Sequence, residues 1–169
     1  MTRFLILLPL LILSACGLRP LYADGRQGGV AATLADVRVA PIEGHAGWLV
    51  RNALRDRIDA SGGDNGRESR FRLDVRLEDS ITGFGVRADD SVTRERRALR
   101  ARYQLVDSAT GETLLDATAQ ADAGVDVVGS EYATIAAESS ALERLSHVIA
   151  DQIIARVAVY AKRTAAPAP

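Results

Sequence analysis

Between residues 70 and 78, apolar side chains occupy every second position, at Phe71, Leu73, Val75 and Leu77, and charged side chains fill the positions between them; we expect the segment to continue to Val86. Alternation with a period of two predicts a β-strand with one buried face and one solvent-exposed face. Gly83 and Gly85 predict a bend toward the end of this strand. This segment is the clearest structural signal in the chain.

Two more alternating segments follow. One runs from about residue 92 to residue 106, and the next begins after Gly111 and carries alanines along one side. Turn-forming residues at Asp89-Asp90 and around Gly111 predict that the three strands form consecutive hairpins. A shorter alternating stretch at residues 36–40 predicts a fourth strand, which precedes the others in the chain.

Helical spacing appears before and after the three long strands. Val50, Leu54 and Ile58 recur every four residues after Trp48, and a longer apolar stripe follows Ser130, a favourable helix N-cap. The combined pattern predicts an α+β fold, with a four-stranded, mostly antiparallel sheet and two helices packed on one face, in the order β-α-β-β-β-α. We expect Trp48 to pack in the core at the head of the first helix.

The N-terminus has a different pattern. An apolar run, Phe4 to Leu13, follows Arg3 and leads into Ser14-Ala15-Cys16. The run is shorter than the roughly 20 apolar residues that a membrane-spanning helix needs, and small residues before a cleavage point are typical of a secretory signal peptide. Cys16 is the only cysteine, and the block resembles a bacterial lipobox, in which the residue after the cut is a lipid-modified cysteine.

These features predict the domain organisation of the chain. We expect a signal peptide at residues 1–15, a lipidated tether at 16–30, a folded domain at 31–163 and a disordered tail at 164–169. The alternative is an ordinary cleaved signal followed by a chance cysteine. With Cys16 modified, no disulfide is possible, so packing alone must stabilise the domain.

Composition gives little support to an enzyme. The net charge is -1, and the two histidines, His45 and His147, have no metal-ligand spacing with other side chains. We find no cluster of acid, base and nucleophile, although such groups can converge in space rather than in sequence. We therefore predict a protein with no enzymatic activity, no cofactor and no metal ion.

One constellation has possible binding chemistry. Arginines share one side of the two longest predicted strands, opposite the apolar side. These are Arg70, Arg72, Arg76, Arg94, Arg96, Arg100 and Arg102. Guanidinium groups bind phosphates and carboxylates through two parallel hydrogen bonds, so this face is a candidate surface for a polyanion. The alternative is a solvated face that Asp74, Glu78, Asp116 and Asp122 neutralise.

The apolar side of the second long strand is interrupted at its start. Glu95 and Arg97 occupy positions where the alternation calls for apolar residues. We therefore expect this end of the hairpin to extend beyond the core.

The block Cys16-Gly17-Leu18-Arg19-Pro20-Leu21-Tyr22 resembles the mature N-terminus of the lipopolysaccharide-assembly lipoprotein family, LptE. Leu18 departs from the pattern, since an aromatic residue is expected there. The predicted element order is also that of the family. Gly17, where an aspartate would favour retention in the inner membrane, is consistent with an outer-membrane lipoprotein.

The resemblance implies a function without catalysis. Members of this family plug and help to assemble a large outer-membrane β-barrel, LptD, and bind lipopolysaccharide during its insertion into the outer leaflet. It also implies a lipid anchor at Cys16, a location at the periplasmic face and in the barrel lumen, and lipopolysaccharide binding by basic residues of the sheet. Nucleic acid is not an expected partner. The alternative is an auxiliary lipoprotein of an ABC-type lipid transporter, or a secretion pilotin.

Overall fold

A computed structural model describes residues 29–62, 69–86, 92–127 and 130–165. The elements follow one another as α2 (Gly29–Ala35), β1 (Val37–Val39), α3 (Gly44–Ala60), β2 (Phe71–Val86), β3 (Val92–Asp107), β4 (Thr113–Asp126) and α4 (Glu131–Ala165). The predicted signal peptide, Cys16 and the Asp89-Asp90 turn lie outside the described residues. None of the helices in the described part of the chain combines the length and apolar character needed to cross a bilayer.

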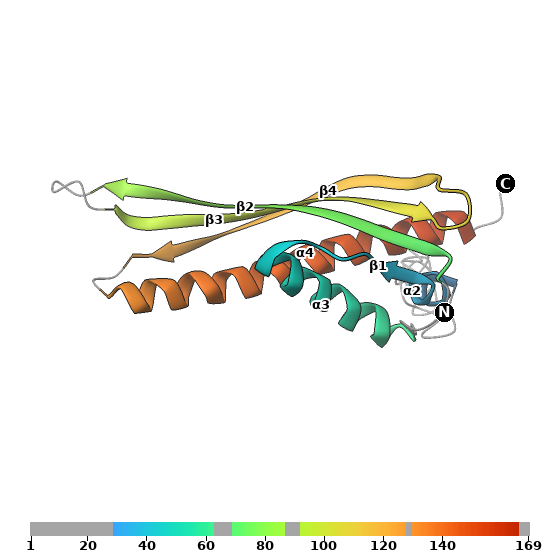
Figure 1. The fold of residues 1–169 in the computed structure, drawn as a ribbon, viewed down its shortest axis with the longest axis horizontal. Coiled ribbons are helices and arrows are strands. Elements are labelled where there is room, and N and C mark those ends of the chain that lie inside the picture. The colour runs from blue at the N-terminus through green and yellow to red at the C-terminus, as the bar shows by residue number, and fades with distance from the viewer. Residues whose placement is uncertain (1–28, 63–68, 87–91, 128–129, 166–169) are drawn as a thin grey trace, which may run out of the picture.

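The four strands form one sheet in the order β1-β2-β3-β4. β1 pairs with β2 in parallel, over three residues only, and the other two pairings are antiparallel. All helices lie on the same side of this sheet (Figure 1). The predicted α+β class, the mostly antiparallel sheet and the one-sided packing of helices are therefore confirmed.

The structure adds a third helix that the sequence analysis does not predict. α2 has seven residues, two of which, Ala31 and Leu34, are buried. Two helical turns are too short to show a helical period in the sequence. α2 begins at Gly29, inside the range assigned to the tether.

The two hairpins follow the predicted alternation. β2 and β3 pair along almost their whole length, with Leu73 opposite Leu105 and Val75 opposite Tyr103. In the turn between β3 and β4, Asp107 Oδ1 accepts hydrogen bonds from the backbone N–H groups of Ala109 (2.9 Å) and Thr110 (3.2 Å). These bonds, together with Gly111 at a positive φ of 72°, close the turn that the sequence predicts.

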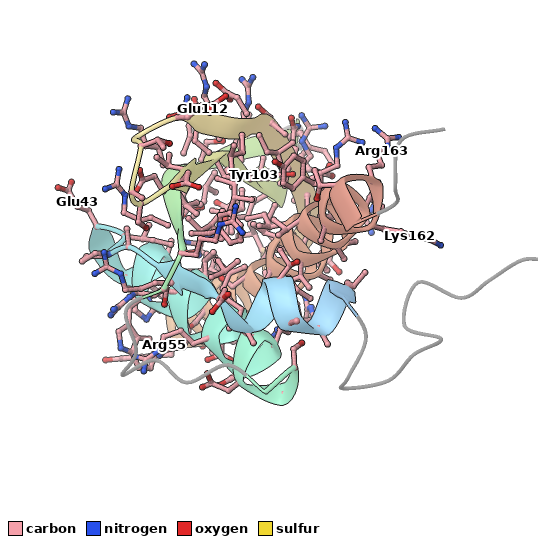
Figure 2. The ribbon with its side chains drawn as sticks, turned by 90° about the vertical axis from the view of Figure 1, so that its right-hand side faces the viewer. Glu43, Arg55, Tyr103, Glu112, Lys162 and Arg163 are labelled. Atoms are coloured by element: carbon pink, nitrogen blue, oxygen red, sulfur yellow. The ribbon has the colours of Figure 1, made fainter. Side chains whose placement is uncertain are left out.

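The core lies between the sheet and α4. Leu142, Leu145, Ile149, Ile153 and Val157 of α4 are buried against the inner face of the sheet. Figure 2, which views the molecule along its length, shows Tyr103 of β3 enclosed between the sheet and the helices. The inner side chains of β4 are mostly alanine, which lets α4 approach closely.

The prediction for Trp48 is wrong, since this side chain is 60% exposed. α3 begins at Gly44, four residues earlier than expected, and its buried face consists of Gly47, Val50, Ala53, Leu54 and Ile58. A Cβ at Gly47 would lie 2.6 Å from the carbonyl oxygen of Ile42. The chain therefore needs a glycine here, and Trp48 faces away from this contact.

Two isoleucines of α4 allow the packing to be tested with matched substitutions. Ile149 is fully buried, whereas Ile135 is 55% exposed although it lies on the same predicted stripe. We expect Ile149→Ala to lower the free energy of unfolding by about 2–5 kcal/mol, because a buried cavity remains. Ile135→Ala should change it by less than about 0.5 kcal/mol. Urea denaturation measures both; equal losses would contradict the core described above.

Candidate functional site

The face of the sheet opposite the helices is the candidate site. The strand register places Arg72 and Arg76 of β2 on this open face, together with Arg94, Arg96, Arg100 and Arg102 of β3. Arg70 precedes β2 and follows the same alternation. The structure therefore brings the predicted arginines together on one surface, and no helix of the described chain covers it (Figure 1).

Four of these arginines are paired with carboxylates. Arg72 pairs with Asp74 at 2.9 Å, Arg94 with Asp126 at 2.8 Å and Arg102 with Asp116 at 3.0 Å. A longer pair, at 3.7 Å, joins Arg70 to Asp107. Hydrogen bonds from Arg102 and Gln104 hold the pKa of the Asp116 carboxyl below its ordinary value, so this partner stays ionised at neutral pH.

Three arginines of the open face have no carboxylate within 4.0 Å among the described residues. They are Arg76, Arg96 and Arg100. Arg96 lies between Thr82 and Gly124 on the neighbouring strands, so no acidic residue is directly opposite. Arg100 lies opposite Glu78 without forming an ion pair. Ion pairs therefore neutralise four of the seven arginines and leave these three without a carboxylate partner in the described chain.

An exposed aromatic side chain, Phe84, adjoins one of the free arginines, Arg96, which is its diagonal neighbour across β2 and β3. Phe84 lies on the open face directly opposite Arg94, and its side chain remains 45% exposed. Because Phe84 stands between two glycines, the sequence predicts only a bend of the strand at this segment. An apolar group beside a free guanidinium group suits a ligand that carries both anionic and apolar parts.

The stretch of β3 around Glu95 and Arg97, where the apolar alternation is interrupted, lies against α4 rather than free in solvent. Arg97 pairs with Asp79 of β2 at 2.6 Å and donates a hydrogen bond to the carbonyl oxygen of Glu138 in α4. The apolar core ends there as predicted, but the N-terminal turns of α4 cover this end of the hairpin (Figure 1). A layer of polar contacts replaces the core.

Glu95 belongs to the same polar layer. Its Oε2 atom is buried and accepts no hydrogen bond within the described chain. Burial raises the pKa of Glu95 above its ordinary value, and the neighbouring Glu138 carboxyl raises it further. The two carboxyl groups can bond to each other only when one of them carries a proton.

The residues that the structure describes hold no group of three or more His, Cys, Asp or Glu side chains arranged to bind a metal ion. His45 and His147 are both exposed and lie on different helices.

Comparison with known proteins gives one family and several similar folds. The profile of the lipopolysaccharide-assembly family LptE matches residues 34–157. No curated protein matches the chain significantly. The matched range extends from α2 to α4 and includes the whole sheet.

Solved structures resemble this one at low sequence identity. A protein from Caulobacter crescentus aligns with a TM-score of 0.66 and 23% identity, over 83% of this chain and all of its own. The rare lipoprotein B of Shewanella oneidensis aligns at 0.61 and 8% identity, over 75% of this chain and 98% of its own. A minor lipoprotein of Acinetobacter baumannii aligns with a TM-score of 0.56 and 13% identity, over 74% of this chain and 92% of its own. At these identities, the likeness is one of fold.

The raised pKa of Glu95 predicts a pH-dependent stability effect. At neutral pH, a carboxyl with a raised folded-state pKa is harder to ionise in the folded chain than in the unfolded chain, so its charge destabilises the fold. We expect Glu95→Gln to raise the Tm at pH 7. The gain should disappear below the ordinary pKa of about 4.3, where Glu95 is protonated in both states. Thermal unfolding across this pH range measures the effect.

A substitution at an exposed glutamate provides the control. Glu143→Gln, on the outer surface of α4, should show no comparable pH-dependent gain. A Tm of the Glu95→Gln variant that is lower than that of the native chain at pH 7 would contradict the assignment.

Proposed function

Because the chain belongs to the LptE lipopolysaccharide-assembly family, we propose that it is an outer-membrane lipoprotein that binds lipopolysaccharide on the open face of its sheet. In this proposal it also helps to assemble a large β-barrel of the LptD type and plugs its lumen. It catalyses no reaction. The lipid anchor is Cys16, and the domain lies at the periplasmic face and within the barrel.

The observation that carries the lipopolysaccharide proposal is the set of free guanidinium groups on the uncovered face. Arg76, Arg96 and Arg100 can donate paired hydrogen bonds to phosphate or carboxylate groups without first breaking an ion pair. Arg76 and Arg100 are diagonal neighbours across β2 and β3, at a spacing of about 7–8 Å. Two groups at that distance can contact one anionic head group together.

The shape of the domain supports the plug proposal. β2 has 16 residues, which at about 3.4 Å per residue corresponds to roughly 54 Å. A long, one-sided sheet leaves a polar surface that needs a partner or water along its whole length. A surrounding barrel wall would supply such a partner, and the acyl chains on Cys16 would hold the domain beside it.

The free and paired arginines provide a direct test. We expect Arg96→Gln combined with Arg100→Gln to weaken binding of purified lipopolysaccharide about tenfold or more, because charge-assisted hydrogen bonds contribute roughly 1.5–3 kcal/mol each. The same substitutions at Arg94 and Arg102, which are already paired with Asp126 and Asp116, should weaken it much less. Titration of the chain with lipopolysaccharide measures both.

The two double variants remove the same number of charges from the same strand. Equal weakening by both would therefore indicate that only total charge matters, and no weakening by either would remove the open face as the binding surface. Circular dichroism before titration confirms that each variant is folded.

The anchor has its own test. We expect Cys16→Ser to abolish acylation, since serine cannot form the thioether, and to remove the chain from the outer-membrane fraction. Without acyl chains, the hydrophobic contribution of about 0.8 kcal/mol per buried methylene is lost. Membrane fractionation with mass spectrometry of the N-terminal peptide measures the result; an unmodified Cys16 in the native chain would refute the lipid anchor.

A further inference from the structure

The outer edge of β2 is covered over only a short length. β1 pairs with β2 from Phe71 to Leu73, and the last bond of this pairing runs from the N–H of Ala40 to the carbonyl oxygen of Leu73, at 3.0 Å. Pro41 follows and has no N–H to donate. The chain then leads into α3, so β2 continues for 13 residues, from Asp74 to Val86, without a strand on that side.

The backbone groups exposed along this edge can be identified from the pairing. Phe71 donates its N–H to Asp36 on the outer side, and Leu73 accepts there from Ala40. Alternate residues of a strand direct their backbone groups to the same edge. The N–H and C=O groups of Val75, Leu77, Asp79 and Ile81 therefore point outward, and none has a backbone partner among the described residues.

The other edge of the sheet is protected. Gln152 of α4 accepts a hydrogen bond from the N–H of Gln120 at 3.3 Å and donates one to its carbonyl oxygen at 3.2 Å. This side-chain amide occupies the middle of the β4 edge, as a neighbouring strand would. Proteins commonly block free edges because these are templates for pairing with another chain. In the described chain, no side chain blocks the β2 edge in this way.

A groove lies where β1 would continue along β2. It has a volume of about 720 Å³, and residues 40–43 and 74–77 line most of it. On the helix side, Leu77 is partly buried and Ile81 is 44% exposed. α4 lies under β3 and β4, and α3 begins near the middle of the molecule and runs toward the β1 end (Figure 1), so Ile81 lies beyond α3 and Leu77 is covered only in part.

The geometry points to strand addition: we infer that the β2 edge from Val75 to Ile81 binds an extended segment of the barrel partner. This inference rests on the proposed function, which supplies the barrel. The added segment pairs with the four outward residues through its backbone. Its side chains alternate, with one set packing on Leu77 and Ile81 and the other lying beside Arg76 and Glu78.

The occupant is a loop or terminal segment of the barrel rather than its wall or a second copy of this chain. The strands of a closed barrel wall are all paired, so the wall has no free edge to offer. In a dimer, residues 40–43 of each copy would lie along the first part of that copy's β2 edge. Less of the two β2 edges would then be available to pair with each other. A single extended segment can enter the groove and follow the edge from its start.

Hydrogen exchange provides the first test, on the full-length lipoprotein alone and in its complex with the barrel. The amides of Val75, Leu77, Asp79 and Ile81 should exchange about tenfold or more slowly in the complex, because each becomes hydrogen-bonded. The amide of Thr118, on the β4 edge, should not change. Equal exchange of the four amides in both states would overturn strand addition.

Proline substitutions provide the second test. Ile81→Pro removes an outward N–H and leaves the β2–β3 ladder intact, and we expect it to lower recovery of the barrel with the lipoprotein severalfold. Ile81→Thr keeps the N–H and should retain most of the recovery. Thr118→Pro makes the matched change on the β4 edge and should leave recovery unchanged.

The outcomes separate the two proposals. Full recovery with a folded Ile81→Pro variant, or a lipoprotein dimer that this substitution dissociates, would overturn strand addition and leave the barrel partnership in place. Failure of the native lipoprotein to recover any barrel would overturn both.

Discussion

The contact between α4 and one face of the sheet determines the rest of the structure. α4 has 35 residues, about 52 Å of helix at 1.5 Å per residue, and β2 and β3 have nearly the same length. The buried side chains of α4 pack on β3 and β4. Arg57 of α3 forms a 2.5 Å ion pair with Asp151 of α4, which links the two helices. Most apolar side chains of the sheet are thereby directed to one side, and Phe84 on the open face is an exception.

Because the helices pack on one side only, the two faces of the sheet have different roles. The inner face of the sheet supplies stability through burial, and the outer face can carry charged side chains without loss of core. Where the apolar seam ends, Arg97 and Glu95 replace it with polar contacts to α4. Free arginines on the outer face and a free edge on β2 remain available for partners, while Gln152 pairs with the middle of the β4 edge.

The alternation of residues along β2 and β3 was sufficient to predict the hairpin, the fold class and the face that carries the arginines, because side-chain direction in a strand depends only on parity. Parity could not show that Arg102 is paired and Arg100 is free. That distinction depends on which acidic side chain of β4 comes within reach once the register is set. The short helix α2 and the exposed position of Trp48 were missed for a related reason. Both depend on tertiary contacts, such as the close approach of Gly47 to Ile42.

The most direct test of the central claim is purification of the tagged, full-length lipoprotein from detergent-solubilised outer membrane, with quantitative mass spectrometry of the proteins that accompany it. The family membership and the open face predict one large β-barrel protein at a stoichiometry close to one per lipoprotein. Recovery of inner-membrane transporter subunits instead, or of the lipoprotein alone, would contradict the account and favour an auxiliary lipoprotein of a lipid transporter.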